Sequence, residues 1–117
     1  MSIVEQLESQ NSQVDYAPHK KFAGVYMLHL VTGEQTEGRF SSHLIKVDPS
    51  CMLDVHVHPE QIEVHQVVQG TAECQIGDTH LSYAPGVVAV IPQNVPHKVE
   101  AGSEGLYMLA QFTPALL

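Results

Sequence analysis

The chain has 117 residues, enough for one domain whose hydrophobic core needs neither disulfides nor a structural metal. Thirteen acidic residues against five basic ones give a formal net charge of −8. Nucleic acids and anionic membranes bind basic surfaces, so this balance excludes both as expected partners and favours attraction of cations.

The N-terminal residues contain neither the basic nor the apolar region of a secretory signal, and no apolar run approaches the roughly 20 residues of a transmembrane helix. We therefore expect a cytoplasmic protein. In that reducing compartment, Cys51 and Cys74 are expected to be free thiols that pack as small core residues.

Residues 1–20 are expected to form an N-terminal segment that is irregular or contains a short helix over 3–10. The polar stretch 9–13 is expected to be mobile. Residues 21–117 are expected to form the main domain. A helix-turn-helix does not fit into the N-terminal segment, which argues against a transcription factor.

The rest of the sequence predicts only strands, each ended by Gly, Pro or Asp. We expect an exposed hairpin loop over 32–39 and a two-residue turn at Gly77-Asp78. Many short strands with turns about every ten residues are typical of an all-β sandwich or closed barrel. The expected strands are 24–31, 40–47, 51–58, 62–69, 71–76, 79–83, 87–91, 97–100 and 106–112.

The third of these strands has one polar and one apolar face, because side chains alternate along a strand. The polar face carries Met52, Asp54, His56 and His58, and the apolar face carries Leu53, Val55 and Val57. If the polar face lies in water, this is an ordinary half-exposed strand. If it faces the interior, the apolar face needs cover from the N-terminal segment or a second subunit, and we then expect a homodimer.

The chemistry of the histidines favours the inward orientation. His56 and His58 lie about 7 Å apart along the strand, and two imidazoles at that spacing can converge on one ion. Glu63 follows a short connection with Pro59 and could supply a third ligand from the next strand. A fourth could come from His97, whose approach is fixed by the two prolines of "IPQNVP".

Two stretches that contain these residues resemble the two cupin motifs. The first is His56-x-His58-x4-Glu63-x6-Gly70, although Ser50 stands where a leading glycine is usual. The second is Gly86-x5-Pro92-x-Asn94-x2-His97, with Asn94 replacing a glycine and Ala101 replacing a final asparagine. We expect Ser50 in a turn, and asparagine tolerates the positive φ that a turn at Asn94 needs.

The resemblance covers about residues 40–112. It implies a small single-domain cupin of the cupin 2 type, whose fold is a double-stranded β-helix, or jelly roll. It also implies that one divalent metal ion is bound by His56, His58, Glu63 and His97.

Three imidazoles and one carboxylate leave two open positions on an octahedral ion, which is typical of a catalytic site. The donor set suits Fe, Mn, Ni, Co, Cu or Zn and leaves the identity of the ion open. His65 follows Glu63 on the same predicted face. It could be a general base in catalysis, a partner that orients Glu63, or an internal polar residue bonded to the backbone. We expect His29, His43 and His80 at the surface.

Two functions remain open, and both require a small-molecule ligand. One is a metal-dependent enzyme, either an oxygenase or a sugar- or uronate-type isomerase or lyase. The alternative is a non-catalytic module that binds or senses a small molecule through the metal. We favour the enzyme, because an ion with open positions can bind and polarise a substrate oxygen.

Overall fold

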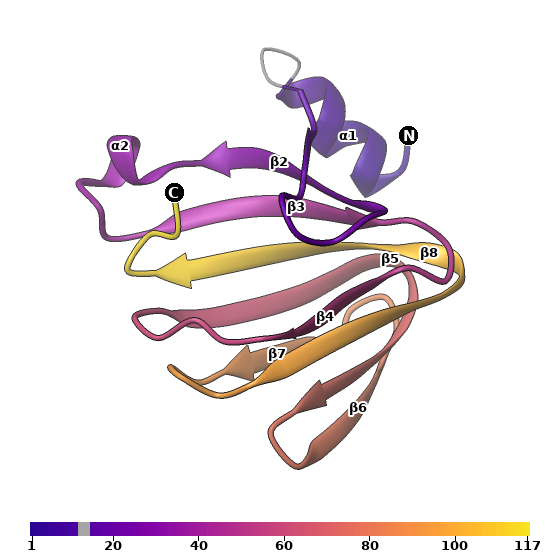
Figure 1. Ribbon diagram of the computed structural model, residues 1–117. Coiled ribbons are helices and arrows are strands. Elements are labelled where there is room, and N and C mark those ends of the chain that lie inside the picture. Colours follow the sequence, from indigo (N-terminus) through magenta and orange to yellow (C-terminus); the bar gives the residue numbers. More distant parts are fainter. Residues whose placement is uncertain (12–14) are drawn as a thin grey trace.

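The computed structural model describes residues 1–11 and 15–117, and it shows the predicted all-β jelly roll (Figure 1). The predicted short helix is present, whereas the mobile stretch predicted over 9–13 lies partly outside the described residues. The helices are α1 (Ile3–Gln10) and α2 (Gly33–Thr36). The strands are β1 (Ala17–Pro18), β2 (Val25–Val31), β3 (Ser41–Val47), β4 (Met52–His56), β5 (Ile62–Ile76), β6 (Thr79–Tyr83), β7 (Val88–Ile91) and β8 (His97–Thr113).

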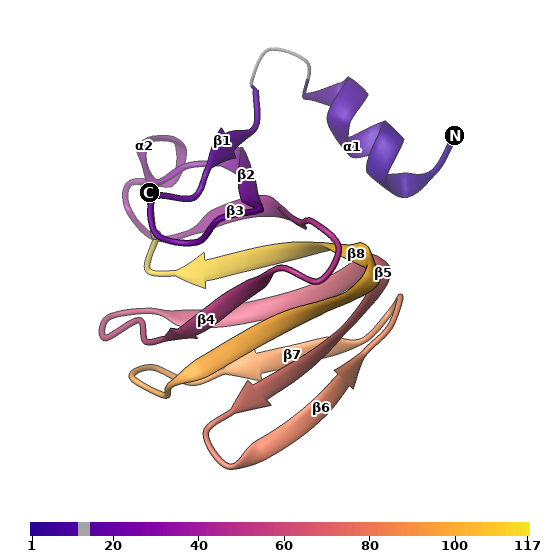
Figure 2. The same cartoon turned by 45° about the vertical axis from the view of Figure 1, so that its right-hand side comes forward.

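All strand pairs are antiparallel. The strand order is β1-β2-β3-β8-β5-β6, with β4 also paired to β8 and β7 also paired to β5. Figure 2 shows the strands folded into two layers, with α1 outside them. The first paired strand, β1, lies within residues 1–20, which the sequence analysis assigns to a separate N-terminal segment. The division of the chain into residues 1–20 and 21–117 stays a prediction.

Two long strands form the centre of the barrel. β5 and β8 pair with each other along most of their lengths, and each also pairs with different strands at its two ends. The sequence predicts two separate strands for each of them, and that prediction was wrong. Gly70 has a φ of 86°, and a Cβ there would overlap the carbonyl oxygen of Gly105. These glycines therefore mark bends where continuous strands cross closely, not strand ends.

Side chains from both layers fill the interior. The buried cluster includes Val25, Ile45, Val47, Leu53, Val67, Cys74, Tyr83, Val99, Leu106, Met108 and Phe112. Cys51 is half-buried against this cluster, and both cysteines are free thiols, as predicted.

The helices show two local start signals. Ser2 Oγ accepts a hydrogen bond from the Glu5 amide at 3.0 Å and begins α1 with a capping box. The predicted hairpin loop over 32–39 does connect the antiparallel pair β2 and β3, but it contains the short helix α2, which the sequence did not predict. At the start of α2, the Gln35 side chain accepts a hydrogen bond from the Thr32 amide at 2.9 Å. This is one of the two reciprocal bonds of a capping box, here with the sequence Thr-x-x-Gln. Neither helix in the described chain has the length and apolar character that a membrane crossing requires.

A bulge in β4 changes the faces that the sequence predicts for this strand. Leu53 pairs with Val99 and His56 pairs with His97, so three steps along β4 match two along β8. The extra residue reverses the alternation between these two positions. Leu53 and His56 therefore both point inward, and the expectation that Leu53 lies on the outer face was wrong. Val55 remains 61% exposed and Val57 43% exposed.

Candidate metal centre

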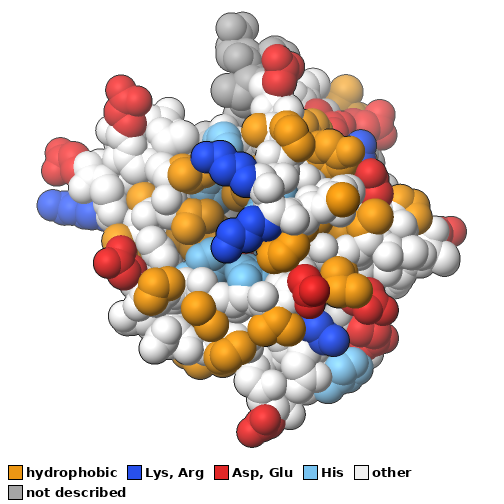
Figure 3. Space-filling view, in the orientation of Figure 1, with side chains coloured by type: hydrophobic (Ala, Val, Ile, Leu, Met, Phe, Trp, Pro, Cys, Tyr) orange, Lys and Arg blue, Asp and Glu red, His pale blue; other side chains and the backbone are white. Residues whose placement is uncertain are grey.

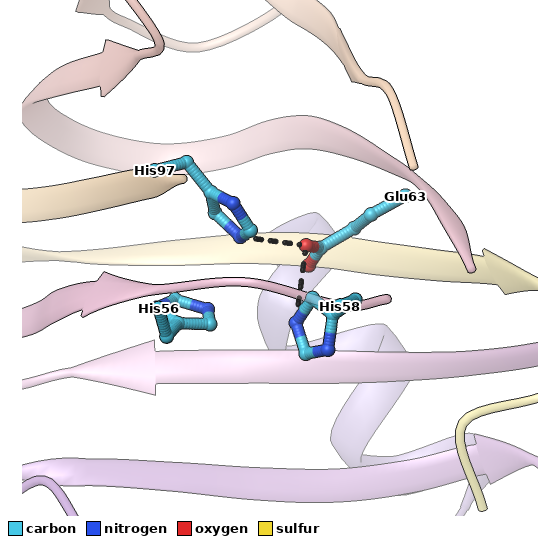
Figure 4. Close-up of side chains that lie close together, drawn as sticks. All are labelled: His56, His58, Glu63 and His97. Carbon is cyan, nitrogen blue, oxygen red and sulfur yellow. Dashed lines mark ion pairs between the residues drawn. The ribbon is translucent and has the colours of Figure 1, made fainter. Parts of the chain in front are cut away.

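Four side chains from three places in the sequence converge inside the barrel (Figure 4). One ligand atom from each of His56, His58, Glu63 and His97 lies within 4.8 Å of the others. Oε1 of Glu63 is 3.1 Å from Nε2 of His97 and 3.6 Å from Nε2 of His58. This group could hold a metal ion.

The strand pairing and one loop explain this convergence. His56 and His97 are partners in the β4–β8 ladder, and their ring centroids are 4.2 Å apart. The loop between β7 and β8 is fastened to the chain near His58, because the Asn94 amide donates to the His58 carbonyl at 3.0 Å. Asn94 has a φ of 66°, which confirms its predicted place in a turn. Ser50, with a φ of 60°, lies in a turn as well.

Backbone carbonyls fix the orientation of two of the imidazoles. Nδ1 of His56 lies 2.7 Å from the Asp54 carbonyl oxygen, and Nδ1 of His97 lies 2.9 Å from that of Val95. Since a carbonyl only accepts, each Nδ1–H donates, and the lone pair of a neutral ring is then on Nε2. Both rings are thereby prepared to bind an ion through Nε2.

Two buried atoms of the group have no hydrogen-bond partner among the described residues. They are Oε1 of Glu63 and Nε2 of His97, which face each other without hydrogen-bond geometry. Buried polar atoms without a partner are costly, and one divalent cation would satisfy both. The donor set therefore fits a metal ion.

The protonation states of Glu63 and His56 also suit a cation. Burial by itself would raise the pKa of Glu63, but the neighbouring imidazoles of His65 and His97 outweigh it and hold this pKa far below its usual range. Burial lowers the pKa of His56 to about 4. At neutral pH, the metal-free site therefore presents a carboxylate and a neutral His56 ring, the forms that bind metals. For His97, burial would lower the pKa, but the contacts with Glu63 and the Val95 carbonyl outweigh it and raise this pKa, so an ion there competes with a proton.

His65 holds the second oxygen of the Glu63 carboxylate. Its Nε2 lies 2.7 Å from Oε2 of Glu63, and its Nδ1 lies 2.9 Å from the hydroxyl of Tyr83. The imidazole is buried, and these two contacts occupy both nitrogens without any backbone bond. Oε1 of Glu63 is left to face His58 and His97.

His29 and His43 form a histidine pair that the sequence analysis missed. The prediction that His43 lies at the surface was wrong: it is fully buried, and His29 is half-buried. Their Nδ1 atoms are 2.8 Å apart, and Nε2 of His43 is 2.9 Å from Oγ of Ser41. Burial, together with the neighbouring His29, lowers the pKa of His43 to about 4. His80 is exposed, as predicted.

An open pocket of about 450 Å³ leads to the candidate metal centre. His56 and His58 line both this pocket and a smaller inner space of about 50 Å³, which Glu63 also lines. Figure 3 shows histidine side chains in a hollow bordered by hydrophobic and by Lys or Arg side chains. A ligand in the pocket would therefore reach the side of the centre that faces solvent.

The family model described as a cupin domain matches residues 43–111, and the chain therefore belongs to the cupin family. No curated protein matches the chain at the level of sequence.

Several solved cupin structures share the fold. KdgF from Halomonas sp. is 19% identical with a TM-score of 0.78, and 89% of each chain is covered. A protein from Thermotoga maritima described as a predicted oxalate decarboxylase is 19% identical with a TM-score of 0.77, over 86% of this chain and 91% of that one. Oxalate decarboxylase from Bacillus subtilis is 21% identical with a TM-score of 0.77, over 91% of this chain but 29% of that one.

Proposed function

We propose that this cupin is a metal-dependent enzyme that acts on a small organic molecule. Its divalent ion would be held by His56, His58, Glu63 and His97. The observation that carries this proposal is the convergence of the four ligand atoms within 4.8 Å at the end of an open pocket. A structural metal site would use all of its positions for protein ligands, whereas on a six-coordinate ion this group of four would leave two positions open towards the pocket.

When bound, the ion would act as a Lewis acid or, if it is Fe, Mn or Cu, activate O2. The donor set also suits Ni, Co and Zn. Bacillus subtilis oxalate decarboxylase is described with Mn(II) centres, which adds Mn to the first metals to test. Glu63 would offset one positive charge of the ion, and the histidines would hold it without adding charge. The reaction would be that of an oxygenase or of a sugar- or uronate-type isomerase or lyase.

His65 is proposed as a positioning residue for Glu63. The alternative role of a general base needs contact with the substrate, whereas His65 is 1% exposed and already bonded at both ring nitrogens. Hydrogen bonds to a ligating carboxylate fix its orientation and tune its basicity. We therefore assign His65 to the support of the metal ligand rather than to proton transfer with a substrate.

A non-catalytic binding or sensing module is the second candidate. It is supported by the wall of the pocket, which is mainly apolar and would bind an organic ligand without any chemical step. Turnover separates the two functions, because metal-dependent ligand binding is common to both.

The test begins with elemental analysis of protein purified without chelators, and anomalous scattering then places the ion. Protein loaded with Fe(II), Mn(II) or Zn(II) is screened against diols, uronates and β-dicarbonyl compounds. Turnover that disappears in Glu63→Ala supports the enzyme. Tight ligand binding without product under every metal supports the module, and no metal at the four residues contradicts both.

We also propose a cytoplasmic homodimer. The two free cysteines agree with a reducing compartment. Val55 and Val57 still need cover, and Val88 and Val90 on β7 are 59% and 60% exposed. Val90 pairs with Val64 on β5, so this second apolar surface, on strands that do not pair with β4, continues onto β5. Light scattering at tens of micromolar tests the proposal, and a monomer there would contradict it.

A further inference from the structure

The pocket differs in charge from the rest of the molecule. Among the described residues that line it, none is acidic, although the chain has thirteen acidic residues. Lys20 and Lys21 do line it, and they are two of only five basic residues in the sequence. In a protein with a net charge of −8, a basic pair beside a pocket without acidic side chains creates a local attraction for anions.

The wall of the pocket is mainly apolar. Phe22, Met27, Val57, Leu116 and Leu117 contribute hydrophobic surface to it. Its volume of about 450 Å³ lies in the range of ~300–1,000 Å³ that is typical of sites for organic ligands. A ligand with only polar groups would leave this surface without contacts, so the wall favours a ligand with an apolar body.

The segment that carries the two lysines is held in place beside the metal centre. The His19 amide donates to the Val25 carbonyl at 2.8 Å, and Nδ1 of His19 accepts from the Lys21 amide at 3.1 Å. The ring of His19 stacks on Phe22, with centroids 4.7 Å apart. Phe22 in turn lies 5.6 Å from His56, measured between ring centroids. These contacts fix the backbone of the basic pair relative to a proposed metal ligand.

We propose that the pocket binds an organic anion with an apolar body, and that Lys20 and Lys21 pair with its negative group at the wall. This rests on the proposed function for the role of the ion, but the lysines and the apolar wall select the ligand with or without metal. The apolar body lies along Phe22, Met27 and Leu116, and its far end reaches His56 and His58. The substrate class is therefore an amphipathic carboxylate rather than a polyol, which among the proposed reactions favours the oxygenase over a reaction on a sugar or uronate.

The test compares hexanoate with its neutral counterpart hexanamide by titration calorimetry on chelator-treated protein. Removing the metal isolates the contribution of the lysines to anion binding, because a bound ion would itself attract a carboxylate. The wild type should bind hexanoate about tenfold more tightly than hexanamide, and acetate about tenfold more weakly than hexanoate. The Zn(II)-loaded protein should keep the same order of affinities.

The double variant Lys20→Gln/Lys21→Gln should bind hexanoate and hexanamide equally. The matched control Arg39→Gln/Lys98→Gln loses the same charge at residues that do not line the pocket, and it should keep the preference. Equal binding of both probes to the wild type, no binding of hexanoate, or an equal loss in the control would overturn the proposal. Equal binding of acetate and hexanoate would overturn the inference that the ligand has an apolar body.

The two proposals fail separately. In Glu63→Ala, the preference for hexanoate should persist while metal binding is lost. A wild-type protein that prefers hexanoate but binds no metal would contradict the proposed enzyme and leave the ligand class intact. Metal binding without any preference for hexanoate over hexanamide would contradict the proposed ligand class and leave the proposed enzyme intact.

Discussion

Nε2 of His65 lies 2.7 Å from Oε2 of Glu63, and the imidazole is held from its other side by the hydroxyl of Tyr83. The carboxylate is thereby bonded at one oxygen, while the other lies among the imidazoles of the candidate centre. A single buried side chain thus determines which oxygen of Glu63 is available to an ion.

His65→Ala should therefore weaken metal binding by about 10- to 100-fold without abolishing it, because all four proposed ligands remain. Tyr83→Phe should have a smaller effect, since His65 keeps its bond to Glu63. Metal affinity measured by competition with a chelator checks both variants. His80→Ala, at an exposed histidine, is the control and should leave the affinity unchanged. An affinity in His65→Ala equal to that of the wild type would refute the positioning role.

His58→Ala should abolish metal binding while the barrel stays folded. The His58 side chain is 19% exposed, and the residue lies just beyond the end of β4 and outside the buried core cluster. Elemental analysis measures the loss of metal, and circular dichroism measures the fold. Unfolding of this variant under conditions where the metal-free wild type stays folded would show that His58 supports the core.

Gly, Pro and alternation predict an all-β sandwich or barrel, because they determine strands locally. The resemblance to the cupin motifs is what implies the jelly roll and the set of four candidate ligands. The sequence could not locate the bulge in β4, since a bulge depends on the register against β8 and therefore on residues far away in the chain. The burial of His43 has the same origin. It is paired with His29 across β2 and β3 and covered by Phe112, contacts that no local pattern encodes.

Gly70 lies within the continuous strand β5, although the sequence analysis interprets this glycine as the end of a strand. A variant of Gly70 tests whether β5 and β8 cross closely there. Gly70→Ala should destabilise the protein by more than the ~1–2 kcal/mol expected for a left-handed alanine, because its Cβ would also overlap Gly105. Gly86→Ala is the matched control: its φ is also positive, at 93°, but no atom lies within 4 Å of the added Cβ. Urea unfolding should show a larger loss for Gly70→Ala, and equal losses would mean that β5 and β8 do not cross closely there.

The buried histidine pair predicts a pH dependence of stability in the metal-free protein. The pKa of His43 is about 4 in the folded state, against about 6.5 when the chain is unfolded. Between these two values the unfolded state binds more protons, so the free energy of unfolding falls as the pH falls from 6.5 towards 4. The shift corresponds to about 3 kcal/mol at most.

His43→Gln should be less stable than the wild type at pH 7, because it disturbs the bonds to His29 and Ser41, but its stability should fall less steeply on acidification. The half-buried His56 also has a pKa of about 4, so part of the slope should remain in this variant. His80→Gln, at an exposed position, should keep the slope of the wild type. Urea unfolding at a series of pH values between 4.5 and 7 measures these slopes. A slope in His43→Gln equal to that of the wild type would mean that His43 takes up its proton without unfolding, and that the pair opens to solvent.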